Sequence, residues 1–174
     1  MFDRTIILNY NLSFDSRLCY AEDYVFTMQY LLYVNKYCLS PETGYYYRIV
    51  NGSLSTKYVD NYEILKYYVI AKYAAASNFI EKFSIPIISV ENRMKQIASD
   101  IQWLVYILYH SNDLKLSTKE EMAELSIRLK GMEYFMSGLY SIIMPICRKN
   151  RCLGDCLLKN FFTIERLLKR FRLS

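Results

Sequence analysis

The feature that most limits the fold is a helical spacing of apolar residues that runs from about residue 58 to the C-terminus. Apolar side chains recur there at steps of three and four, which places them on one face of an α-helix. In chain order the four stripes are Tyr62, Leu65, Val69, Tyr73, Ala76 and Ile80; Val90, Met94, Ile97, Ile101, Leu104 and Leu108; Met122, Leu125, Leu129, Met132, Met136, Leu139, Ile143 and Ile146; and Leu157, Phe161, Ile164, Leu168 and Phe171. Each stripe predicts an amphipathic helix that needs a partner to cover it.

Local signals set the expected limits of these helices. Pro86 separates the first stripe from the second. Ser117, followed three residues later by Glu120, predicts a capping box at the start of the third helix, in which each side chain bonds a free backbone N–H. Pro145 is expected to end or bend that helix, because proline lacks an N–H and its ring clashes with the preceding turn.

The first 57 residues have a different pattern, made of short segments with turn residues between them. The loop Pro41 to Gly44 lies between runs of aromatic and β-branched residues and predicts a short β-hairpin. We therefore expect a mainly α fold: a four-helix, bundle-like C-terminal region (58–174) packed as one unit with a small mixed N-terminal segment (1–57). An intermolecular coiled coil is a second interpretation of the same stripes.

Composition supports a folded chain without a membrane span. The chain has 174 residues, of which 53% are apolar and 22% charged, so it can form a core and is not of the disordered class. No segment reaches the roughly 20 apolar residues that cross a bilayer. Asp3 and Arg4 follow the first Met, and no cleavage site follows an apolar block, so we expect a cytoplasmic location.

The cysteines predict neither disulfides nor a metal site. Their number, five, is odd and no export signal accompanies them, so they are expected to be reduced. Cys147, Cys152 and Cys156 follow a C-x4-C-x3-C spacing, which differs from the close pairs of zinc sites, and the single histidine, His110, is distant. We expect no metal and no cofactor in this chain.

Glu22 and Asp23 precede a run of aromatic and aliphatic residues, and this acidic pair has two interpretations. Acids in the first turn of a helix interact favourably with its dipole, by roughly 0.3 to 1 kcal/mol each. A placed carboxylate is also what a general base requires. A like-charged neighbour raises a carboxylate pKa and a helix N-terminus lowers it, so the sequence leaves both interpretations open.

A resemblance to known enzymes favours the second interpretation, the general base. Two segments carry it: "LSFDSRLCYAEDYVFTMQYLL" and "CLSPETGYYYRIVNGSLST". Read together, they resemble the second half of the catalytic domain of family 2 glycosyltransferases, the GT-A fold enzymes of bacterial polysaccharide and glycolipid synthesis. The resemblance covers about residues 1–57. The matching positions, in order, are Phe14-Asp15, Glu22-Asp23, Phe26, Leu31-Leu32, Tyr46-Tyr47-Arg48, Gly52, Ser53 and Ser55.

The resemblance implies roles for these residues. Asp23 would be the base that takes the proton from the acceptor hydroxyl during inverting attack on the sugar donor, and Glu22 would shape the acceptor side. The implied loop over the donor diphosphate, or the acceptor-binding surface beside it, comprises Tyr47, Arg48, Ser53 and Ser55. A guanidinium and hydroxyl groups are suitable partners for charge on a departing diphosphate.

The chain departs from the family in one major respect. Family members hold the nucleotide on an N-terminal Rossmann-like half with a D-x-D metal motif, and these residues contain no Asp-x-Asp. We therefore expect the C-terminal portion of a glycosyltransferase that is inactive by itself. Its nucleotide-sugar, glycan or lipid-linked acceptor and divalent metal are expected only in a full-length enzyme.

The basic C-terminus predicts further contacts. The net charge is +5, and the residues from 148 onward hold essentially all of the excess positive charge. The last helix can therefore lie on an anionic membrane as a peripheral contact at the inner face, or expose a solvated basic face. A non-catalytic helical module that binds a partner protein or membrane is the alternative function. We expect no nucleic-acid binding, since no recognisable motif is present, and exposed aromatic residues favour a homodimer.

Overall fold

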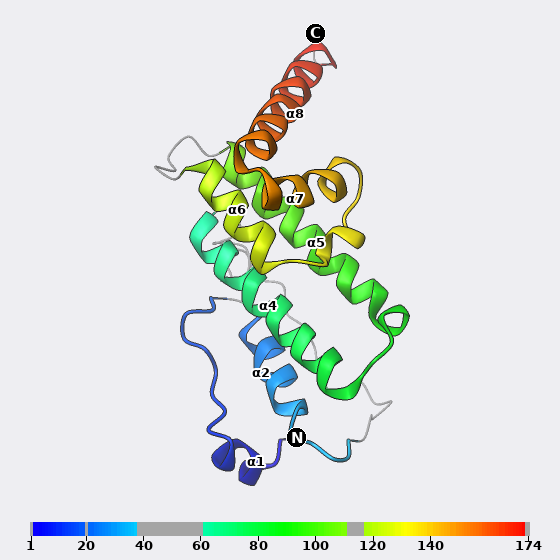
Figure 1. Cartoon of the computed structure of the whole chain (residues 1–174). Helices are drawn as coiled ribbons and strands as arrows, with labels where there is room; N and C mark the ends of the chain where they lie inside the picture. Colours follow the sequence, from blue (N-terminus) through cyan, green and yellow to red (C-terminus); the bar gives the residue numbers. More distant parts are fainter. Residues whose placement is uncertain (1, 20, 38–60, 111–116, 173–174) are drawn as a thin grey trace. The chain divides into compact units, whose positions relative to one another are not determined.

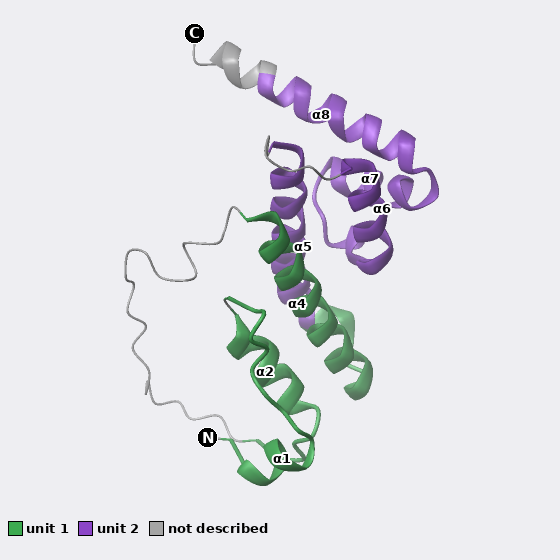
Figure 2. Cartoon of the chain, turned by 90° about the vertical axis from the view of Figure 1, so that its left-hand side faces the viewer, with its two compact units in different colours: residues 1–89 green, residues 90–174 purple. Residues whose placement is uncertain are grey.

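The computed structural model describes residues 2–19, 21–37, 61–110 and 117–172. These residues are mainly helical, which confirms the mainly α fold, and they include no strand (Figure 1). The chain divides into two compact units, Met1–Ser89 and Val90–Ser174 (Figure 2). The hairpin expected at Pro41 to Gly44 and the boundary expected at residues 57/58 lie outside the described residues and stay predictions.

Unit 1 contains α1 (Arg4–Asn9), α2 (Glu22–Leu31) and α4 (Tyr62–Phe83). α2 packs against α4. α4 follows the first apolar stripe closely, begins where Asn61 Oδ1 accepts a hydrogen bond from Ile64 N (3.1 Å), and ends at Ser84 in the left-handed region (φ 50°). The first predicted helix is therefore confirmed, with an asparagine cap at its start.

Unit 2 contains nearly all of α5 (Ile87–His110), followed by α6 (Thr118–Arg128), η1 (Met132–Tyr134), α7 (Leu139–Lys149) and α8 (Arg151–Arg172). α6, α7 and α8 pack against one another, and η1 packs on α7. The largest fully buried side chains of unit 2 are Ile97, Ile101, Leu104, Met122, Leu125, Leu129, Met132, Ile143, Met144, Leu158 and Phe162. Removal of this apolar area from water is the main stabilising term of the unit.

The third predicted helix is wrong as one continuous helix. Two glycines break it: Gly131 precedes η1 with φ 96°, and Gly138 precedes α7 with φ 57°. Glycine adopts positive φ without the steric cost that a Cβ brings. The apolar steps of three and four continue across both breaks because α6, η1 and α7 each bury apolar side chains.

Two local expectations also need correction. Ser117 is the N-cap of α6, but its side chain makes no capping hydrogen bond, so the capping box is wrong; Glu120 instead pairs with Arg151 (2.8 Å). Of the two outcomes expected at Pro145, the helix end is wrong, because α7 continues to Lys149, and the bend stays a prediction. The buried neighbours Ile143, Met144 and Cys147 anchor this helix, which offsets the lost backbone hydrogen bond.

The fourth predicted helix is confirmed as α8, but its packed face is not the predicted one. Leu157 and Ile164 belong to the predicted stripe and are 36% and 57% exposed. The buried apolar side chains of α8 are Leu158 and Phe162. α8 approaches α7 closely at Gly154, where a Cβ would lie 2.4 Å from Cys147 Sγ. The helix therefore has two apolar faces, of which α5, α6 and α7 cover one.

Candidate functional site

The acidic pair lies where the sequence places it, at the first turn of α2. Ala21 precedes the helix in the left-handed region (φ 54°), and Glu22 and Asp23 follow it. Asp23 is exposed and Glu22 is half-buried. Asp23 Oδ1 accepts a hydrogen bond from Tyr24 N (2.7 Å). The carboxylate therefore faces solvent while it contacts the positive end of the helix dipole.

Aromatic contacts hold α2 in place beneath this pair. Phe14 stacks on Phe26 with ring centroids 4.4 Å apart, and Phe2 meets Phe26 edge-on at 5.3 Å. Tyr30 OH accepts a hydrogen bond from Asp3 N (2.7 Å). Val25, Phe26 and Tyr30 are buried. The acidic pair thus begins a helix whose other face is fixed, which limits the positions that the two carboxylates can adopt.

Asp15 forms a second polar cluster in unit 1. Arg17 donates from Nε (3.0 Å) and Nη2 (2.9 Å) to its two carboxylate oxygens, and the Tyr67 hydroxyl also donates to it. The Arg17 guanidinium lies 4.6 Å from the centre of the Tyr67 ring. Hydrogen bonds from Arg17, and then from Tyr67, hold the pKa of Asp15 well below its ordinary value. Asp15 is therefore a permanent anion at neutral pH and a poor proton acceptor.

A polar pocket of about 350 Å³ lies at this cluster. Its lining residues are Asn11, Leu12, Ser13, Phe14, Asp15, Ser16, Arg17 and Gln29. The pocket offers hydroxyl, amide, carboxylate and guanidinium groups, which are hydrogen-bonding partners for a polyhydroxylated ligand. Its lining includes Phe14-Asp15, one part of the family pattern, and Gln29 of α2.

A second pocket in unit 1 is apolar and measures about 650 Å³. Its lining residues are Thr27, Leu31, Val34, Asn35, Tyr37, Phe79, Phe83 and Ile85. Most of them come from the C-terminal parts of α2 and α4 and the residues that follow, whereas Asp23 lies at the start of α2. Its lining therefore does not include the acidic pair.

The other predicted site residues, Tyr47, Arg48, Ser53 and Ser55, lie outside the described residues. The expectation that Asp23 and Arg48 flank one cavity stays a prediction. The sequence reasoning placed Phe14-Asp15 in the family pattern but missed the partners Arg17 and Tyr67. Arg17 offered a local signal, two residues from Asp15, whereas Tyr67 lies 52 residues away and nothing in the sequence linked it to Asp15.

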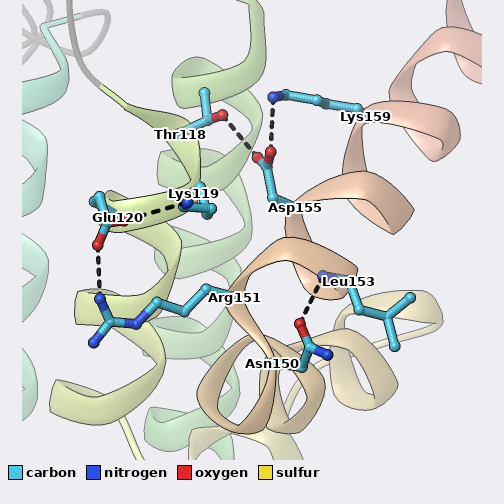
Figure 3. A network of polar contacts seen from close by, with 8 residues as sticks. All are labelled: Thr118, Lys119, Glu120, Asn150, Arg151, Leu153, Asp155 and Lys159. Atoms are coloured by element: carbon cyan, nitrogen blue, oxygen red, sulfur yellow. Dashed lines mark hydrogen bonds and ion pairs between the residues drawn. The ribbon is translucent and has the colours of Figure 1, made fainter.

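The polar residues of unit 2 form closed networks instead. Asp155 on α8 is 7% exposed and accepts hydrogen bonds from Thr118 Oγ1 (2.7 Å) and Tyr109 OH (2.8 Å), while Lys159 Nζ lies 2.7 Å from its other oxygen (Figure 3). Burial raises the pKa of Asp155, but hydrogen bonds from Lys159, Thr118 and Tyr109 outweigh burial and hold the pKa below its ordinary value. The network joins α5, α6 and α8.

Arg148 makes a comparable connection near the end of α7. Its Nε donates to Ser126 O (2.8 Å), and its Nη1 and Nη2 contact the two Glu133 oxygens at 3.2 and 3.3 Å. Glu133 also accepts a hydrogen bond from Gly131 N (2.8 Å). Burial raises the pKa of Glu133, but the Arg148 hydrogen bond and two backbone N–H groups lower it below its ordinary value. These contacts tie α6, the Gly131 turn and α7 together.

The cysteines of unit 2 do not form a cluster. Cys147 is buried, whereas Cys152 and Cys156 are exposed. Burial raises the pKa of the Cys147 thiol to about 11. Within the described residues, no group of His, Cys, Asp or Glu side chains fits a metal ion.

Comparison with known proteins found no matching family model, curated protein or solved structure. In the part of the chain that the structure describes, no helix combines the length and apolar content that a membrane crossing requires.

Proposed function

We propose that this chain is the acceptor-side and helical C-terminal portion of an inverting glycosyltransferase of the family 2 type, with Asp23 as the base. The observation that carries the proposal is the placement of Asp23: its carboxylate is exposed at the first turn of α2, on a helix whose opposite face is buried. A general base needs both access to the substrate hydroxyl and a fixed position.

The chemistry follows from that placement. A sugar hydroxyl is a weak nucleophile until its proton is accepted during attack, and Asp23 would accept it. Glu22, half-buried beside it, would shape the acceptor side. The pocket at Asp15 and Arg17 offers hydrogen bonds to the hydroxyl groups of an acceptor glycan. Because Asp15 is held as an anion by Arg17 and Tyr67, it orients ligands and leaves proton transfer to Asp23.

Donor binding is assigned to residues outside these 174, since the chain has no Asp-x-Asp motif and the described residues have no metal-binding group. The proposal therefore expects no sugar transfer by the isolated chain. Arg48, Ser53 and Ser55 would close over the donor diphosphate in the full-length enzyme, a role that rests on the family resemblance.

The test has two arms. In the first, the isolated chain is incubated with nucleotide sugars and a divalent metal, and release of nucleotide is measured; the proposal expects no release above buffer. In the second, the reading frame upstream of Met1 is determined, and any longer protein is assayed for transfer to glycan acceptors. A nucleotide-binding half with a D-x-D motif supports the proposal. Turnover by the isolated chain, or a longer protein whose upstream part does not bind a nucleotide sugar, contradicts it.

A further inference from the structure

α8 carries a second apolar stripe that its own unit leaves exposed. Leu153, Leu157 and Ile164 are 49%, 36% and 57% exposed, and Phe161 between them is half-buried. At about 100° per residue these four positions fall within roughly 80° of the helix circumference. Leu158 and Phe162, which are buried, lie on a different face. The exposed stripe is therefore continuous and distinct from the packed face.

The packed face accounts for the attachment of α8 to the rest of unit 2. Phe162 contacts the rings of Tyr109 and His110 at 5.2 and 5.0 Å, and Asp155 bonds Thr118 of α6. Figure 1 shows that α8 then runs on past α6 and α7. The exposed stripe is not needed for these contacts, so it is available for another surface.

Charge indicates which surface fits. The sequence of α8 has six basic and two acidic residues, a net charge of +4. Among the α8 side chains that the structure describes, Lys159 pairs with Asp155, and most of the excess positive charge of the helix comes from Lys169, Arg170 and Arg172 in its sequence. A helix that combines an exposed apolar stripe with a net positive charge matches the pattern of helices that lie in the interface of an anionic membrane.

A second copy of the chain fits less well. Pairing two stripes would bring two helices of net charge +4 side by side, and like charges oppose that arrangement. An anionic surface neutralises the same charge. The sequence continues the apolar spacing through Leu168 and Phe171, so the segment is long enough to lie along such a surface.

We propose that the outer stripe of α8, centred on Leu153, Leu157 and Ile164, docks the chain on an anionic phospholipid surface with the helix parallel to the membrane plane. This proposal rests on α8 alone and does not depend on the glycosyltransferase assignment. Apolar insertion and electrostatic attraction both contribute, so the binding is expected to require the stripe and to weaken with salt.

The test is co-sedimentation of the whole chain with vesicles of phosphatidylcholine alone and of phosphatidylcholine mixed with phosphatidylserine. The stripe variant is the double substitution Leu157→Gln and Ile164→Gln. The control is Ile127→Gln on α6, because Ile127 and Ile164 are each 57% exposed. Circular dichroism and the thermal midpoint establish that both variants fold; since all three positions are exposed, neither substitution opens a core cavity.

The expected result is binding of the unchanged chain and of Ile127→Gln to the anionic vesicles about tenfold tighter than to the neutral ones, with loss of binding in the stripe variant. Added salt should release the bound chain. The proposal is overturned by equal binding to both vesicles, by equal binding of the stripe variant and the control, or by binding that salt leaves unchanged. It is also overturned if sedimentation velocity shows a dimer that only the stripe variant loses, without vesicle binding.

Discussion

The two units use their charged residues in different ways. In unit 1 Asp23 is exposed, and the Arg17 side chain is 72% exposed although it pairs with Asp15. In unit 2 Asp155 and Glu133 have side chains only 10% and 13% exposed, and several donors engage each of them. Asp155 and Glu133 therefore connect elements of unit 2, whereas Asp23 and Arg17 of unit 1 are more open to solvent.

Asp15 and Asp155 make this comparison quantitative, because each accepts a hydrogen bond from a tyrosine and pairs with a cation. Asp155→Ala leaves the hydroxyl groups of Tyr109 and Thr118 without their acceptor in a buried site and should lower the free energy of unfolding by about 3 kcal/mol. Asp15→Ala should cost about 1 kcal/mol, since water replaces the lost partner. Urea denaturation of both variants measures the two losses in free energy of unfolding. Equal losses would contradict the difference that we infer between the two units.

The same contrast applies to the two arginines, with a smaller expected effect. Arg148→Met removes the hydrogen bond to Ser126 O and the pairing with Glu133, and should cost about 2 kcal/mol. Arg17→Met should cost clearly less than Arg148→Met, because the Arg17 side chain is 72% exposed and water replaces the lost pairing with Asp15. Thermal unfolding of the two variants is the measurement. If Arg17→Met lowered the stability as much as Arg148→Met does, Arg17 would have a structural role like that of Arg148.

The sequence predicted a helix correctly where its apolar residues form one dominant face. Tyr62 to Ile80 gave α4, and Val90 to Leu108 gave α5, because each segment has one dominant apolar face. Apolar spacing did not predict the helix breaks at Gly131 and Gly138, because the spacing depends on which residues are apolar and not on the backbone conformation between them.

For α8 the sequence predicted the helix but not the covered face. The stripe through Leu157 and Ile164 is as apolar as the pair Leu158 and Phe162, and only tertiary packing selects between them. The close approach at Gly154 favours the second face, because that position alone on α8 lacks a Cβ.

For the candidate site, the sequence predicted the position of Glu22 and Asp23 at a helix start, and the structure agrees. The bond from Tyr67 to Asp15 joins residues that are far apart in the chain, so no local pattern could predict it. The aromatic stacking of Phe14 on Phe26, which links the two parts of the family pattern, has the same origin in tertiary structure.

Acid should weaken the networks of unit 2. The folded-state pKa of Asp155 lies below its ordinary value of 3.8, so this carboxylate contributes stability above that pH and loses the contribution as pH falls toward the folded-state pKa. Asp155→Asn removes this titration. The stability gap between the unchanged chain and the variant should therefore narrow as the pH falls below 3.8, as followed by urea denaturation across acidic pH. A gap that stays constant with pH would contradict the lowered pKa.

The smallest expected effect concerns the first turns of α2 and α4. Asp23→Asn and Glu63→Gln each remove an exposed acid from a helix N-terminus, and each should cost between roughly 0.3 and 1 kcal/mol. Chemical denaturation of the two variants side by side sharpens the comparison. A much larger loss of stability for Asp23→Asn than for Glu63→Gln would mean that Asp23 stabilises the fold of unit 1. That result would contradict its description as an acid whose main contact is solvent.

The central proposal, that Asp23 is the base of a sugar transferase, is tested most directly by the rate of sugar transfer of the longer protein that the proposal expects, measured for Asp23→Asn and for Glu63→Gln. Both substitutions remove an exposed acid at a helix start, so their structural effects are matched. If Asp23 is the base, Asp23→Asn loses about 10² to 10⁴-fold in transfer rate while Glu63→Gln keeps the unchanged rate. Equal rates in the two variants would contradict the assignment of Asp23 as the base.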